Sequence, residues 1–219
     1  MRGTYWEDFP QWTGQDVKDW SHGNAVSYDP STDVLLAGLR HQDAVVGLAR
    51  ATGGDVQWIL APPANWGAAW APLLLQPAGP GDVQPYHMHG AKFTPAGTIV
   101  LFDNGNNRAS AYEPPVSGFD NYSRAMEIAV DPVARTWRTV WTFGEDLVPP
   151  QYSGSLGDVD VLVETDHVLV TFGNVADPDR RGPHPRGDGA RARSCGTSPC
   201  PRERHHLPQP ADAGFVPGL

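Results

Sequence analysis

Two stretches of this 219-residue sequence, residues 22–58 and 89–141, repeat the same order of strand-like segments. Each stretch contains four short segments rich in β-branched or aromatic residues. A third stretch, 157–176, begins in the same way and then loses the pattern. Four-stranded units of about 40 to 50 residues are typical of β-propeller blades, which must pack against one another to bury their faces. The repeat therefore predicts an all-β fold, a partial β-propeller of about two to three blades within residues 1–178.

Individual strands are predicted where short apolar runs end at Asp, Gly, Pro or Asn. The chain has 24 glycines and 22 prolines, which disfavours long helices between these runs. The predicted strands cover residues 34–37, 44–48, 56–60, 98–102, 126–130, 136–141 and 167–172.

The charge of the chain is unevenly divided. Its 25 acidic and 16 basic residues give a net charge of −9, but the first 179 residues alone hold 22 acidic and 9 basic groups, a net charge of −13. A body this negative does not match a phosphate backbone, so we expect no nucleic-acid partner. The sequence has no run of about 18 apolar residues and no apolar signal core after Met1, so we expect no membrane span and recognise no export signal in it.

Residues 179–219 differ in composition from the body. They are rich in Arg, Pro, Gly and Ala and lack periodic apolar residues, which predicts a disordered tail. This composition resembles out-of-frame translation of a GC-rich gene. Cys195 and Cys200 lie here, followed by His205 and His206. These side chains are of the types that bind zinc, but the segment offers no scaffold, and incidental residues are the simpler interpretation.

A histidine opens each complete unit: His22 in D-W-S-H-G-N and His89 in Y-H-M-H-G-A. The innermost strand of every propeller blade lines the central channel, so residues that open the units are expected to converge there. A single histidine is equally well explained by a structural hydrogen bond to a neighbouring strand. The matching positions of the two favour a functional site.

The triplet His87-Met88-His89 has a second interpretation. Alternate residues of a strand face the same side, so both imidazoles would be able to face a metal ion. A metal site of this kind needs a carboxylate nearby, whereas Lys92 follows and no acid occurs before Asp103. We therefore assign no metal.

Arg108 follows the strand and turn L-F-D-N-G-N-N-R. Asp-Asn and Asn-Gly are ordinary turn residues, so residues 103–107 are explained by structure alone. Arg108 carries a permanent charge, and its planar fork suits the oxygens of a sulfate or phosphate group. Arg40-His41 is a weaker case of the same pattern, for which a solvated or loop-bracing role is the simpler interpretation.

Six motifs occur in a fixed order along residues 15–176: D-W-S-H-G-N (19–24), L-R-H-Q-D-A-V (39–45), T-G-G-D-V-Q-W-I-L (52–60), His89, L-F-D-N-G-N-N-R (101–108) and S-R-A-M-E (123–127). Together they resemble the bacterial arylsulfate sulfotransferases. The resemblance implies a six-bladed β-propeller that transfers a sulfuryl group from a phenolic sulfate ester to a phenol. It also implies that neither a nucleotide sulfate donor nor any other cofactor is needed.

The resemblance implies a two-step reaction in which a histidine accepts the sulfuryl group as sulfohistidine and then passes it to the second phenol. His22 matches the histidine of the family's D-W-x-H-x-N motif, His89 the histidine of its second motif, and Arg108 the arginine after D-N-G. These three residues are predicted to be catalytic, as sulfuryl-binding and acid/base groups.

The sequence departs from the family in one respect. The family's sulfated histidine lies beyond the arginine, where this chain has His167, His184 and the two tail histidines. His167 opens a predicted strand and is interpreted as structural, and His184 lies between prolines outside any strand. We therefore expect a partial member of the family in which the nucleophile is absent and which is inactive because it is truncated.

Two further alternatives remain open at this level. A non-catalytic propeller fragment that binds a ligand or partner is the second functional hypothesis. The resemblance implies a periplasmic or secreted protein, whereas a chain without an export signal would stay in the cytoplasm.

Overall fold

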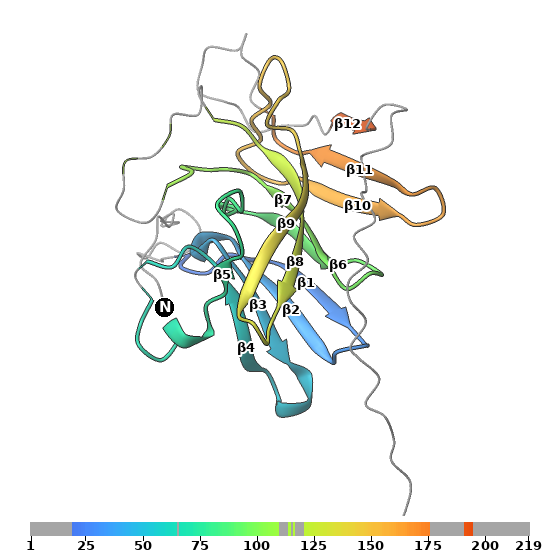
Figure 1. Ribbon diagram of the computed structural model, residues 1–219. Helices are drawn as coiled ribbons and strands as arrows, with labels where there is room; N and C mark the ends of the chain where they lie inside the picture. Colours follow the sequence, from blue (N-terminus) through green and yellow to red (C-terminus); the bar gives the residue numbers. More distant parts are fainter. Residues whose placement is uncertain are drawn as a thin grey trace, which may run out of the picture.

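The computed structural model describes residues 19–64, 66–109, 114, 116 and 121–175, and the backbone of residues 191–194. This part of the chain is all-β, as predicted, and its helical segments are three-residue 3-10 turns (Figure 1). None of the described helical segments is long and apolar enough to cross a membrane. His184 and the tail residues Cys195, Cys200, His205 and His206 fall outside the described residues.

The first repeat unit forms one four-stranded antiparallel sheet in chain order. Its strands are β1 (Gly23–Asp29), β2 (Val34–Leu39), β3 (Ala44–Ala49) and β4 (Asp55–Leu60). Short turns connect them because residues at the corners adopt positive φ, among them Asp43 at 48° in the turn between β2 and β3. The predicted strands 34–37, 44–48 and 56–60 are confirmed, and the segment that opens the unit forms the fourth strand, β1.

The second unit forms the central sheet, with the order β5-β9-β8-β7-β6. Its four predicted strands are β6 (His89–Phe93), β7 (Ile99–Asp103), β8 (Arg124–Asp131) and β9 (Thr136–Phe143). The prediction missed β5 (Gln76–Pro77), a two-residue strand that pairs with β9 in parallel.

The third sheet contains β10 (Asp158–Leu162), β11 (His167–Phe172) and β12 (Arg191–Ser194). The first two form the expected hairpin at the start of the third unit. β12 pairs antiparallel with β11 inside the segment 179–219, for which no strand was predicted. The other residues of that segment lie outside the described part, so its disorder stays a prediction, as does the assignment of the sheets to propeller blades.

Two apolar clusters join the three sheets, and β7 contributes to both. Ile99 and Leu101 pack with residues of the first sheet, including Leu36. Val100 and Phe102 pack with residues of the third sheet. Alternate side chains of a strand point to opposite faces, so the continuous apolar run of β7 is buried on both sides. The central sheet is therefore the middle layer of the described structure.

Gly157 provides a test of the contact between the central and third sheets. Its φ is +110°, and a Cβ atom built on it would lie 2.3 Å from the ring of the fully buried Phe102. Gly54 has a similar φ of +108° but open space around it. We predict that Gly54→Ala costs about 1–2 kcal/mol of unfolding free energy from backbone strain alone, and that Gly157→Ala costs about 1–3 kcal/mol more from overpacking.

Urea unfolding of the two variants measures this difference. Equal losses of stability would contradict the close packing of Gly157 on Phe102.

Candidate functional site

Four histidines gather where β1 and β6 begin: His22, His41, His87 and His89, called here the histidine cluster. The ring centroids of His22 and His41 lie 4.6 Å apart, and those of His41 and His87 lie 5.7 Å apart. The charge of His22 acts on the pKa of His89, which places the two unit-opening histidines within electrostatic reach of each other. The sequence prediction that they would lie close together agrees with this arrangement.

His41 lies in the 3-10 turn η1 (Arg40–Gln42) and is 1% exposed. Its Nδ1 is hydrogen-bonded to the backbone carbonyl of Asp19, which only accepts, so Nδ1 carries the proton. The lone pair of the neutral ring therefore sits on Nε2, where it accepts from Arg40 Nη1 at 2.6 Å. Burial lowers the pKa of His41, a change that its Asp19 bond opposes and the Arg40 charge reinforces.

Arg40 is 5% exposed, so the solvated role considered for it is wrong. Its Nη2 donates to the backbone carbonyl of Gly154 at 3.2 Å, across 114 residues of sequence. Arg40 therefore braces the segment 152–156 against η1, as the other role required, and its charge acts on both His41 and His89.

His89 is the first residue of β6. Its Nδ1 lies 2.7 Å from Oδ1 of Asn104, a fully buried side chain. Burial lowers the pKa of His89 more than the bond to Asn104 raises it, and the positive charge of Arg40 lowers it further. His89 is therefore a neutral imidazole at neutral pH, suited to accept a proton or to attack an electrophile.

His87 does not share a strand face with His89. It precedes β6 and has a φ of +51°, so the alternation assumed for the triplet fails. Its Nδ1 lies 2.9 Å from Asp43 Oδ1, close enough for an ion pair, although the angle does not make a hydrogen bond. The two imidazoles are thus directed to Asp43 and Asn104 rather than to a common metal position.

A different group, Asp19, His22 and His41, is the one within the described residues whose ligand atoms lie close enough together for a metal ion. His22 Nδ1 already pairs with the Asp19 carboxylate, and both nitrogens of His41 are engaged by Asp19 and Arg40. This geometry makes a hydrogen-bonded cluster rather than a set of open ligands.

Arg108 lies beyond the end of β7 and is held by three neighbours. Its Nε donates to Asn121 at 3.0 Å, its Nη1 to Asp103 at 3.1 Å and its Nη2 to the carbonyl of Tyr122 at 2.7 Å. Asp103 is fully buried and also accepts from Arg124 at 2.9 Å. Since a guanidinium has five N–H groups, Arg108 retains two for an anionic ligand.

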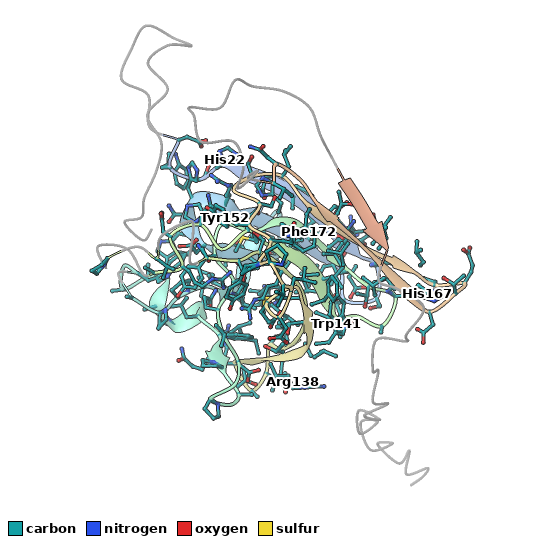
Figure 2. All side chains as sticks on the ribbon, turned by 90° about the horizontal axis from the view of Figure 1, so that it is seen from above. His22, Arg138, Trp141, Tyr152, His167 and Phe172 are labelled. Atoms are coloured by element: carbon teal, nitrogen blue, oxygen red, sulfur yellow. The ribbon has the colours of Figure 1, made fainter. Side chains whose placement is uncertain are left out.

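Tyr152 connects Arg108 with the histidine cluster. Burial raises the pKa of its phenol, and the charges of Arg40 and Arg108 both oppose the rise, so both guanidinium groups act on it. Figure 2 shows Tyr152 on the same side of the molecule as His22, with His167 at the far end of the third sheet. The three predicted catalytic residues therefore border one region, organised around the segment 152–156.

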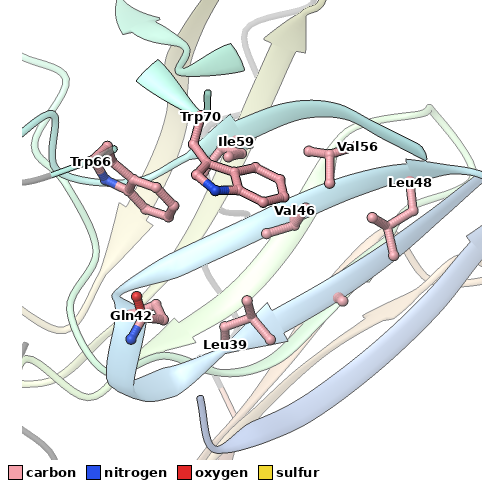
Figure 3. Close-up of a pocket in the computed structure, with 9 residues that line it drawn as sticks. Leu39, Gln42, Val46, Leu48, Val56, Ile59, Trp66 and Trp70 are labelled. Atoms are coloured by element: carbon pink, nitrogen blue, oxygen red, sulfur yellow. The ribbon is translucent and has the colours of Figure 1, made fainter. Parts of the chain in front are cut away.

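An apolar cavity of about 200 Å³ lies on the face of the first sheet opposite to the one that packs on the central sheet (Figure 3). Residues of β2, β3 and β4 form its floor, and Trp66 and Trp70 form its wall. None of the described residues that line it is ionisable, so they offer no group for acid/base chemistry.

Comparison with known proteins identifies the family of this chain. Residues 4–193 match the arylsulfotransferase (ASST) family. The chain belongs to the arylsulfotransferase family. It is 31% identical over 146 residues to an arylsulfate sulfotransferase AssT of Escherichia coli O6:H1, covering 59% of this chain and 23% of that protein. It is 28% identical over 176 residues to one of Lelliottia amnigena, covering 72% of this chain and 28% of that protein. The chain thus spans about a quarter of the length of these relatives.

In this member of the family, the sequence analysis undervalued Arg40 and His41 and missed Asn104. All three lie in or beside turns, and asparagine is common in turns for structural reasons. The clearest available signal was the run of polar residues 40–43, which the structure buries completely between two apolar strands.

The lowered pKa values of His41 and His89 predict how stability changes with pH. Both rings are neutral in the fold, whereas in the unfolded chain they titrate near 6.5. Below that pH the unfolded state binds more protons, so the melting temperature should fall as the pH drops from about 7.5 to 5.5.

The variant His41→Asn should show a flatter pH dependence over this range in thermal melts. His167→Asn, which alters an exposed histidine, serves as the control and should keep the wild-type slope. Equal slopes for the wild type and His41→Asn would contradict the assignment.

Proposed function

We propose that the chain transfers a sulfuryl group from a phenolic sulfate ester to a phenol through a sulfohistidine, without a nucleotide donor. The two relatives are named arylsulfate sulfotransferases, which supports the donor class. The observation that carries the proposal is the pairing of neutral imidazoles with guanidinium groups around the segment 152–156.

In the first half-reaction an imidazole nitrogen forms a bond to sulfur while the bond between sulfur and the aryl oxygen breaks. The electron pair leaves with the aryl oxygen, and the phenolate takes the proton that the attacking imidazole loses from its second nitrogen. Negative charge on the sulfuryl oxygens is stabilised by the two remaining N–H groups of Arg108. His22 lies at the protein surface, with 35% of its side chain exposed, and can exchange this proton with solvent.

In the second half-reaction an acceptor phenol gives its proton to an imidazole, and its oxygen bonds to sulfur as the nitrogen–sulfur bond breaks. The proton acceptor must be neutral at the working pH. His89 meets this condition because burial and the charge of Arg40 lower its pKa. We assign His89 the acid/base role and Arg108 the sulfuryl-binding role.

The proposal also assigns the nucleophile of the first half-reaction. The family resemblance puts it beyond Arg108, where His167 is the one histidine among the described residues. His167 is exposed and lies far from His22 (Figure 2). We therefore propose that any covalent adduct forms on the histidine cluster.

A non-catalytic binding role is the second candidate function. It is favoured by Arg108, whose three nitrogens all donate to protein groups, as a purely structural arginine would do. The two proposals differ in whether a sulfuryl group becomes attached to the chain.

We predict that incubation of the full chain with 4-nitrophenyl sulfate adds one sulfuryl group to a histidine, and that added phenol then removes it. Mass spectrometry with peptide mapping locates the adduct, and absorbance of 4-nitrophenolate follows the rate. Replacing the acid/base group in His89→Gln should lower the rate on the order of 10²-fold.

His167→Asn is the matched control and should react like the wild type. If neither an adduct nor sulfated phenol forms with a folded wild-type chain, the catalytic proposal is wrong and the binding role is favoured.

A further inference from the structure

We propose that Asn104 is a positioning residue that holds His89 with its proton on Nδ1 and its lone pair on Nε2. The inference rests on the proposed function for its catalytic meaning, but the protonation state it assigns can be measured without any activity. No part of it requires Asn104 to touch substrate.

The side-chain amide of Asn104 can adopt one orientation only. Its Nδ2 lies 2.8 Å from the backbone carbonyl of Ser153 and 2.7 Å from that of Leu156. Both partners are acceptors, so the atom between them must be the NH₂ group with its two donors. The other amide atom, 2.7 Å from His89 Nδ1, is therefore the oxygen.

The orientation of the amide fixes the tautomer of His89. An amide oxygen accepts and never donates, so the neutral imidazole must present Nδ1–H to it. The lone pair of the neutral ring then lies on Nε2. His89 thus offers one defined nitrogen to a ligand.

Asn104 is itself rigidly held. It is fully buried at the end of β7, and its backbone carbonyl accepts from Ser123 Oγ at 2.7 Å. Ser123 Oγ also accepts from the Ser153 amide at 2.8 Å, which closes a network around the same segment. A buried network with every member satisfied allows little rearrangement, so the imidazole cannot exchange tautomers without breaking it.

A purely structural role for Asn104 is the competing explanation, because the residue also braces the segment 153–156. Asn106 provides the matched control. Its Nδ2 donates to the carbonyl of Gly154 at 2.9 Å, so it braces the same segment without contacting His89. A loss of bracing alone would affect both variants in the same way.

The experiment measures imidazole ¹⁵N and ¹H shifts of the full chain labelled with ¹⁵N-histidine, with His89 assigned from the His89→Gln spectrum. The wild type should show Nδ1–H for His89 at pH 7.5. Asn104→Ala should produce a mixture of the two tautomers, and Asn106→Ala should keep the wild-type pattern. A wild-type ring with Nε2–H, or an Asn104→Ala ring unchanged from the wild type, would overturn the inference.

Asn104→Asp provides a second test, although it puts a carboxylate oxygen between the two carbonyls, and the wild-type tautomer decides the inference if neither variant folds. Asn104→Asp keeps an acceptor next to Nδ1 but adds a negative charge, so the pKa of His89 should rise relative to the wild type. Arg40, His22 and the backbone carbonyl of His87 also act on this pKa and are unchanged in the variant. An unaltered titration of His89 would count against the contact.

Activity separates this inference from the proposed function. If the wild type transfers sulfuryl groups, Asn104→Ala should lower kcat in proportion to the share of His89 that loses the Nδ1–H tautomer, about two-fold for an equal mixture, with a smaller change in KM. A kcat unchanged by the loss of the Nδ1–H tautomer would overturn the positioning role. If the wild type transfers nothing, the proposed function fails, while the NMR result still decides the tautomer.

Discussion

Asp103 and Asn104, two adjacent and fully buried residues at the end of β7, hold the candidate site together. Asp103 binds both Arg108 and Arg124, whereas Asn104 binds His89 and two carbonyls of the segment 153–156. Buried polar groups are costly unless they are paired, so Asp103 and Asn104 both require the partners that they bind. One turn of the chain thereby sets the positions of a cation on one side and a neutral imidazole on the other.

The chemistry of the site follows from what surrounds each charged or polar group. Arg40 and Arg108 are brought close to buried histidines and a phenol rather than to solvent. Positive charge and burial both favour the neutral form of an imidazole, so the site combines cations for an anionic ligand with uncharged nitrogen bases. This combination suits the transfer of a sulfuryl group, whose oxygens are anionic and whose leaving group needs a proton.

The fold was largely predictable from the sequence, because its strands are encoded by local apolar patterns. β7, β8 and β11 were found from runs of β-branched and aromatic residues, and the histidines that open β1 and β6 were paired by their equivalent places in the repeat. β5 was missed since its two residues form a strand only by pairing with β9, 60 residues away. The roles of Arg40 and Asn104 depend on contacts with Gly154 and Ser153, 114 and 49 residues distant, which turn-forming sequences do not reveal.

The two-sided burial of β7 also determines how the described sheets can come apart. Removal of the first sheet would expose Ile99 and Leu101, and removal of the third would expose Val100 and Phe102, all of which are 0–1% exposed. Either loss would leave one strand with a bare apolar face in water, at about 25 cal/mol for each Å² uncovered. Partial unfolding that spares β7 is therefore penalised at both faces, and the three layers are expected to melt as a single cooperative unit.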